Sequence, residues 1–178
     1  GDRSLVSLVA HELAHSWSGN LVTNATWNDF WLNEGFTVYF ENRIMEALKG
    51  RDYSEMLAYI SYQDLVSEVN DMGTENPDTR LALDLTGRHP DDGMTSIAYD
   101  KGYYFLRLIE ETVGRPAFDA FLNDYFKNRA FKSTHTASFL EELNDKLLVN
   151  HPEVADQIHV DQWVHHTGIP ENIPTAKS

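Results

Sequence analysis

The segment His11-Glu12-Leu13-Ala14-His15 places two imidazoles and a carboxylate on one short stretch with helical spacing. At ~3.6 residues per turn, side chains four positions apart differ by about 40° around the helix axis, so His11 and His15 can share one metal ion. Glu12 lies about 100° round from His11, where it reaches a water on that ion more easily than the ion itself. The segment therefore predicts a helix that carries most of a metal site.

A catalytic zinc normally has a third protein ligand, and the best candidate is Glu34. It follows Trp31-Leu32-Asn33 at the start of a second helical pattern, after Gly19 has ended the first. If the second helix runs antiparallel to the first, the carboxylate points back at the histidine pair. Each feature also has a structural explanation, such as a buried histidine or a glutamate that suits the helix dipole. The combination favours one Zn²⁺ per chain, bound by His11, His15 and Glu34.

These residues carry a resemblance to a known family. The stretches HELAHSWSGN and TWNDFWLNEGFTVYFE resemble the gluzincin aminopeptidases, the family that contains aminopeptidase N and leukotriene hydrolase, and are most similar to its leukotriene-hydrolase-like branch. The resemblance implies a thermolysin-like catalytic domain, zinc on His11, His15 and Glu34, and Glu12 as general base. It also implies a peptide substrate with a free N-terminus.

Attack of water on an amide creates an oxyanion that usually needs a hydrogen-bond donor besides the metal. The candidate donor is Tyr99, which precedes Asp100-Lys101-Gly102 and an aromatic-rich helical pattern. This stretch resembles the tyrosine motif of the family, which implies that Tyr99 donates to the oxyanion. Periodicity alone is equally consistent with a buried tyrosine at a helix start.

Two further acidic residues are weaker candidates for the site. Asp91 lies eight residues before Tyr99, where the leukotriene-hydrolase branch has an aspartate that helps to open an epoxide. The surrounding loop is rich in aspartate, so the match is easily coincidental. Glu41 lies two helical turns beyond Glu34, where it would either support the ligand or be a solvated surface charge. Both readings of Glu41 stay open.

Composition limits the class of protein. The chain has 178 residues, 42% of them hydrophobic, which is the size of one domain with a substantial core. No apolar run approaches the ~20 residues of a membrane span, and cysteine is absent, which leaves the compartment undecided. A formal charge of −14 argues against a nucleic-acid partner and favours cationic ligands such as a peptide amine.

The sequence predicts an all-α fold in a single helical domain over residues 1–178, with no sheet beyond one short hairpin. Helical spacing and turn residues separate the elements, whereas the segment 74–98 is a long turn-rich connection and 170–178 is expected to be a flexible tail. The expected helices cover about 4–18, 29 to 50, 52–72, 100–113, 115–126, 136–147 and 161–166.

The chain is expected to be a fragment of a larger catalytic domain. It begins at Gly1 without an initiator methionine, and nothing before the metal helix could form the strand-containing lobe of a zincin. The family's G-x-M-E-N motif, which implies recognition of the substrate amine, is absent, and Glu41 lies mid-helix and cannot replace it. We therefore expect a zinc aminopeptidase fragment with little activity alone, partnered by the remainder of the catalytic domain. The alternatives are a non-catalytic zinc-binding helical module and an epoxide hydrolase that uses Asp91.

Overall fold

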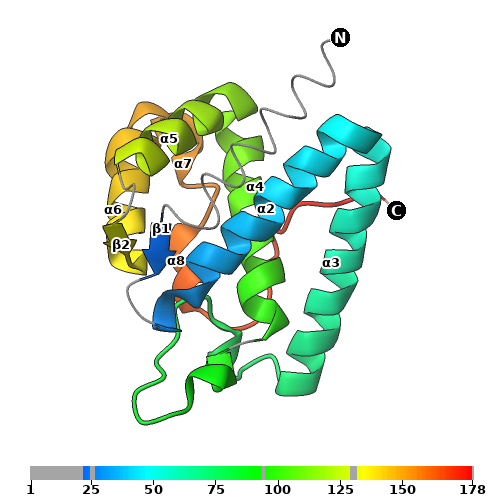
Figure 1. Cartoon of the computed structure of the whole chain (residues 1–178), viewed down its shortest axis with the longest axis vertical. Helices are drawn as coiled ribbons and strands as arrows, with labels where there is room; N and C mark the ends of the chain where they lie inside the picture. Colours follow the sequence, from blue (N-terminus) through cyan, green and yellow to red (C-terminus); the bar gives the residue numbers. More distant parts are fainter. Residues whose placement is uncertain (1–21, 25–26, 94, 129–131, 178) are drawn as a thin grey trace.

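A computed structural model describes residues 22–24, 27–93, 95–128 and 132–177. Within these ranges the architecture is all-α, as predicted, with two three-residue strands added (Figure 1). The predicted opening helix over about 4–18 lies outside the described residues. The helices are α2 (Phe30–Lys49), α3 (Arg51–Met72), α4 (Gly102–Val113), α5 (Arg115–Asn128), α6 (Thr136–Lys146), α7 (Pro152–Ala155) and α8 (Val160–His165), and the strands are β1 (Val22–Asn24) and β2 (Lys132–Thr134).

Helices α2 and α3 form an antiparallel pair, and α4 packs along α2 (Figure 1). The chain turns between α2 and α3 at Gly50, whose φ of 97° lies in the region that only glycine adopts easily. The N–H of Gly50 donates to the carbonyl of Glu46 at 2.9 Å and closes the last turn of α2. The predicted helix end at this glycine is thus confirmed.

Aromatic side chains form most of the core between α2, α5 and α6. The ring of Phe139 is fully buried and lies 5.9 Å from Trp31, 5.6 Å from Phe36 and 5.4 Å from Tyr125, each in an edge-to-face arrangement. Such pairs add about 0.5–1.5 kcal/mol each to the burial of their apolar area. These contacts determine which face of α2 packs against the core. They therefore also determine where the side chains on its opposite face point.

The two strands pair in parallel, with Val22 opposite Lys132. The hairpin that the sequence allowed is therefore not what forms, because hairpin strands are antiparallel and adjacent in the chain. Next to β2, the carboxylate of Asp29 accepts hydrogen bonds from the backbone N–H and the hydroxyl of Thr136 at 2.9 and 2.7 Å. The indole of Trp31 donates to the same hydroxyl at 3.0 Å. The start of α2 is thereby attached to the start of α6.

The connection before α4 ends in a π-helical turn over Ile97–Lys101. The side chain of Lys101 is fully buried, and its ammonium donates to the carbonyls of Thr79 at 2.8 Å and His166 at 3.0 Å. One lysine therefore ties this turn to both the long connection and the end of α8.

Residues 170–177 contain neither helix nor strand, and they lie against the helices. Ile173 and Ala176 pack on the core, the side chain of Asn172 accepts from the indole of Trp163 at 2.8 Å, and the N–H of Lys177 donates to Glu55 at 2.9 Å. The flexibility expected of this tail stays a prediction. In the described part of the chain, no helix has the length and apolar character needed to cross a bilayer.

Candidate active site

Helix α2 and the π-helical turn bring Glu34 and Tyr99 together, although the two residues lie far apart in the sequence. The hydroxyl of Tyr99 lies close enough to the carboxylate of Glu34 to lower the pKa of that carboxyl, and the negative charge of Glu34 in turn raises the pKa of the Tyr99 phenol. The ring of Phe30, one turn earlier on α2, meets the ring of Tyr99 edge-on at 6.0 Å. Both polar side chains are half-buried. The structure thus places the proposed third ligand and the proposed oxyanion donor in one location.

The surroundings of Glu34 favour a cation beside it. Burial raises the pKa of Glu34, the hydrogen bond from Tyr99 opposes this, and the negative charge of Glu41 raises it further. Asn33 donates to the same carboxylate at 3.5 Å, but no lysine or arginine among the described residues forms an ion pair with it. A partly desolvated carboxylate in this position is stabilised in its charged form by a nearby positive charge. This environment fits a metal ligand.

Tyr99 stays protonated at neutral pH. Burial raises its pKa, and the negative charge of Glu34 and the hydrogen bond to it act in the same direction. A neutral phenol keeps its proton available for donation, as an oxyanion donor requires.

Glu41 occupies the expected face of α2, two turns beyond Glu34, and its side chain is exposed. The negative charge of Glu41 raises the pKa of Glu34, the candidate ligand. A supporting group would instead donate a hydrogen bond or carry the opposite charge. Both roles considered for Glu41, support of the ligand and a solvated surface charge, stay predictions.

Asp91 lies in the short 3-10 turn Pro90–Gly93, and 73% of its side chain is exposed. Its carboxylate lies 3.3 Å from Nδ1 of His89, and its backbone N–H donates to the same atom at 3.1 Å. No described contact joins Asp91 to Glu34 or Tyr99. Its role in epoxide opening stays a prediction.

The residues His11, Glu12 and His15 lie outside the described part of the chain. Within that part, no group of three or more histidine, aspartate or glutamate side chains is placed to hold a metal ion. Two of the three predicted zinc ligands, His11 and His15, lie outside that part, and the zinc site stays a prediction.

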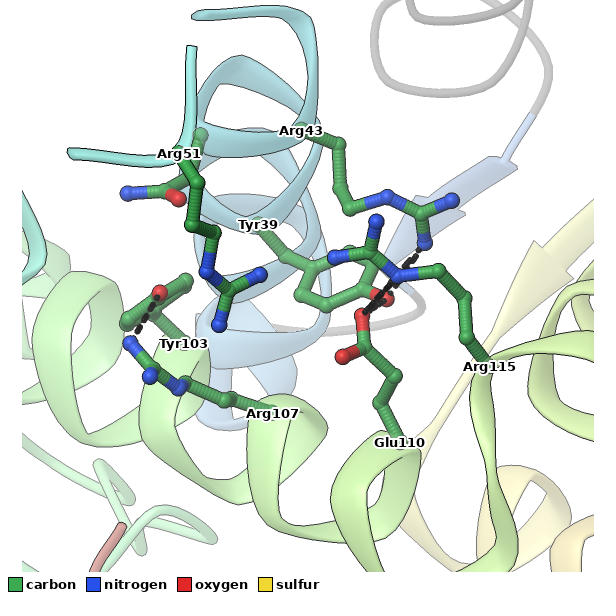
Figure 2. Close-up of a pocket in the computed structure, with 8 residues that line it drawn as sticks. Tyr39, Arg43, Arg51, Tyr103, Arg107, Glu110 and Arg115 are labelled. Carbon is green, nitrogen blue, oxygen red and sulfur yellow. Dashed lines mark hydrogen bonds and ion pairs between the residues drawn. The ribbon is translucent and has the colours of Figure 1, made fainter. Parts of the chain in front are cut away.

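Sequence reasoning missed a cluster of four arginines between α2, α3, α4 and α5, shown in Figure 2 with the tyrosines beside it. A local signal existed in the pairs Arg51–Glu55 and Arg107–Glu111, which have the i,i+4 spacing of helical ion pairs. The longer-range pairs could not be read from spacing. The cluster consists of Arg43, Arg51, Arg107 and Arg115, paired with Glu46, Glu55, Glu110, Glu111 and Asp119.

This arginine cluster joins the helices and is poorly suited to binding an anion. Its five carboxylates outnumber its four guanidinium groups, and the cavity between them is about 10 Å³, room for about one water. Burial acts to raise the pKa of Glu55, but the N–H of Lys177 and the guanidinium of Arg107 outweigh it and hold that pKa below its ordinary value. The charges of the cluster are therefore satisfied within the chain.

The sequence profile described as the Peptidase family M1 domain matches residues 1–163. The chain belongs to peptidase family M1. Leucine aminopeptidase 2 of Sclerotinia sclerotiorum is 41% identical over 172 residues, which cover 96% of this chain and 28% of that protein. A leukotriene A-4 hydrolase homolog of Botryotinia fuckeliana is also 41% identical, over 96% of this chain and 27% of its own length. The resemblance to the leukotriene-hydrolase-like branch is thereby confirmed.

Solved M1 structures share the fold. The native leukotriene A4 hydrolase of Saccharomyces cerevisiae superposes with a TM-score of 0.84 at 39% identity, over 97% of this chain and 28% of that one. The M1 zinc metallopeptidase of Deinococcus radiodurans superposes with a TM-score of 0.67 at 26% identity, over 96% of this chain and 35% of that one. This M1 chain therefore spans just over a quarter of the length of the curated relatives above.

Proposed function

We propose that this M1 chain is the helical, zinc-carrying part of an aminopeptidase catalytic domain, which removes N-terminal residues from peptides. The observation that carries the proposal is the proximity of Glu34 and Tyr99, whose side chains perturb each other's pKa, in a chain that also contains the H-E-x-x-H segment. Membership of family M1 and similarity to proteins named leucine aminopeptidase support the reaction class.

The donor set suits zinc. Two imidazoles and one carboxylate, from His11, His15 and Glu34, are common ligands of a catalytic zinc and leave one coordination position open. When bound, zinc lowers the pKa of a water molecule and polarises the carbonyl of the substrate. The desolvated carboxylate of Glu34, without a cationic side chain beside it in the described structure, is consistent with this role.

The protein's own residues then handle the protons and the developing charge. Glu12 accepts the proton of the attacking water and delivers it to the leaving amine. Tyr99 donates its phenolic proton in a hydrogen bond to the oxygen on which negative charge develops. Its raised pKa keeps it a donor throughout.

The amine of the substrate is bound elsewhere in the larger protein. The relatives' additional length leaves room for a second wall of the cleft and for the groups that anchor a free N-terminus. The net charge of −14 favours the approach of a positively charged amine but does not select it. Epoxide hydrolysis with Asp91 stays a prediction from the sequence.

Replacement of Tyr99 by phenylalanine tests the proposed chemistry in a longer protein that carries this sequence. Tyr99→Phe should lower kcat for an aminoacyl-anilide by about 10²–10³, the range for loss of one oxyanion donor, with little change in KM. Tyr53→Phe, at an exposed position on α3, is the matched control and should leave kcat unchanged. A loss confined to KM would contradict the oxyanion role.

Metal content tests the ligand set in the 178-residue chain itself. After dialysis against trace zinc, the wild type should hold one zinc per chain, while His15→Ala and Glu34→Ala should hold much less. His89→Ala, at an exposed histidine on the surface turn, is the control and should retain zinc. Equal zinc in the wild type and His15→Ala would refute the site. A non-catalytic zinc module would instead show normal zinc content and no turnover of the aminoacyl-anilide in the longer protein.

A further inference from the structure

Helix α2 meets the start of α4 at two glycines, and their backbones touch. A Cβ built on Gly102 would lie 2.9 Å from the Cα of Gly35, and a Cβ built on Gly35 would lie 3.0 Å from the Cα of Gly102. The atoms encountered belong to the backbone, so no side chain can swing aside to make room. The carbonyl oxygens of Trp31 and Ala98 flank the contact at 3.5 Å from the added carbons.

The need for glycine at position 102 is steric. Its φ of −58° and ψ of −47° are those of an ordinary right-handed helix, which alanine adopts readily. Alanine would be favoured in a helix interior by about 1 kcal/mol if only the backbone mattered. The close approach of α2 is therefore what makes glycine necessary here.

The contact lies directly beside the candidate active site. Glu34 immediately precedes Gly35 on α2, and Tyr99 lies three residues before Gly102 on the π-helical turn. The interacting carboxylate and phenol are thus carried by the two backbones that touch at the glycines. The distance between these backbones determines the separation of the two side chains.

We infer that Gly102 and Gly35 are positioning residues, whose contact holds Tyr99 close to Glu34. The inference rests on the proposed function for its effect on turnover. The contact between the two side chains is described by the structure itself, so the effect on that contact can be measured without zinc or substrate.

The size of the displacement follows from the contact distance. Restoring ordinary van der Waals contact from 2.9 Å requires the backbones to separate by about half an ångström. Groups that orient a metal ligand typically change metal affinity by about 10–100-fold when altered. A misplacement of about 1 Å can cost about 10²-fold in rate. Gly102→Ala should therefore weaken zinc binding and lower kcat by about tenfold each.

The experiment compares Gly102→Ala with Gly114→Ala in both the 178-residue chain and a longer protein that carries it. Gly114 has a φ of 94°, so alanine there strains the backbone, but its nearest neighbouring atom lies 4.0 Å from the added carbon and the residue is remote in sequence from the site. Both variants lose stability, whereas only Gly102→Ala should alter zinc affinity and kcat. Gly35→Ala is the second variant if Gly102→Ala does not fold.

Two double-mutant cycles separate positioning from general damage. The first cycle combines Glu34→Gln with Tyr99→Phe and measures their coupling energy from the free energy of unfolding, with a chelator present. This coupling energy should be at least halved when the same cycle is repeated in the Gly102→Ala background. In kcat, Gly102→Ala should have little further effect once Tyr99→Phe is present.

An undiminished coupling, or the same changes in Gly114→Ala, would overturn the inference. So would a full additional loss of kcat in the Tyr99→Phe background. If the coupling falls as expected but Tyr99→Phe alone leaves kcat unchanged, the positioning role stands and the proposed chemistry fails.

Discussion

The stability of this protein should depend on pH through Asp100, next to the candidate oxyanion donor. Only 8% of Asp100 is exposed, and burial together with the negative charge of Asp64 on α3 raises its pKa to about 7, against an opposing hydrogen bond from Ser61. In the unfolded chain the pKa returns to an ordinary value of about 3.9. The folded state therefore binds a proton more tightly than the unfolded state does.

The direction and size of the effect follow from this difference. Because the pKa is raised on folding, the contribution of Asp100 to stability is fully present below about pH 4 and is lost as the pH rises through about 7. Each pKa unit corresponds to about 1.4 kcal/mol, so the contribution should fall by about 2.5 kcal/mol between pH 5 and pH 8. Asp100→Asn keeps the shape of the side chain and removes this titration.

Urea denaturation followed by far-UV circular dichroism measures the effect at pH 5 and pH 8, with a chelator present to remove metal. The free energy of unfolding of the wild type relative to Asp100→Asn should be lower at pH 8 than at pH 5 by about 2.5 kcal/mol. Asp64→Asn should reduce this difference, because one cause of the raised pKa of Asp100 is then removed. Equal pH dependence in the wild type and Asp100→Asn, within about 0.5 kcal/mol, would refute the reasoning.

Three further outcomes are expected. Glu12→Gln in a longer protein that carries this sequence should reduce turnover by about 10²-fold or more while zinc content stays normal, and near-normal turnover would exclude it as the general base. Arg107→Leu should lower the free energy of unfolding, measured in urea, by about 3 kcal/mol, because it leaves the buried Glu55 without one of its partners. A loss below about 1 kcal/mol would show that Arg51 and the N–H of Lys177 are enough to stabilise the charge of Glu55. The zinc-bound 178-residue chain should show a kcat/KM for an aminoacyl-anilide at least tenfold below that of the longer protein, because positioning of the substrate needs the rest of the cleft. A smaller difference would mean that this chain binds the substrate amine itself.

Local sequence patterns were sufficient to predict the longer described helices, whereas the four-residue helix α7 was missed. The interior of α2 and its end at Gly50 follow from helical spacing and from the positive φ that glycine allows, and both depend on residues within a few positions of each other. His11, His15 and Glu12 were proposed as ligands and base for the same reason, since residue type and spacing within a helix determine which side chains share a face. Glu34 was proposed from its residue type and from the expected antiparallel pairing of the next helix. The roles assigned to His11, Glu12, His15, Glu34 and Tyr99 stay predictions.

Only the tertiary structure showed which distant segments meet. No spacing rule connects Glu34 to Tyr99, or Gly35 to Gly102, because their separation depends on how closely two helices approach and not on the local conformation of either. The arginine cluster and the parallel pairing of β1 with β2 were missed for the same reason. Helix formation depends on neighbours along the chain, whereas the site depends on packing between α2 and the π-helical turn, where the absence of two methyl groups allows the backbones to touch.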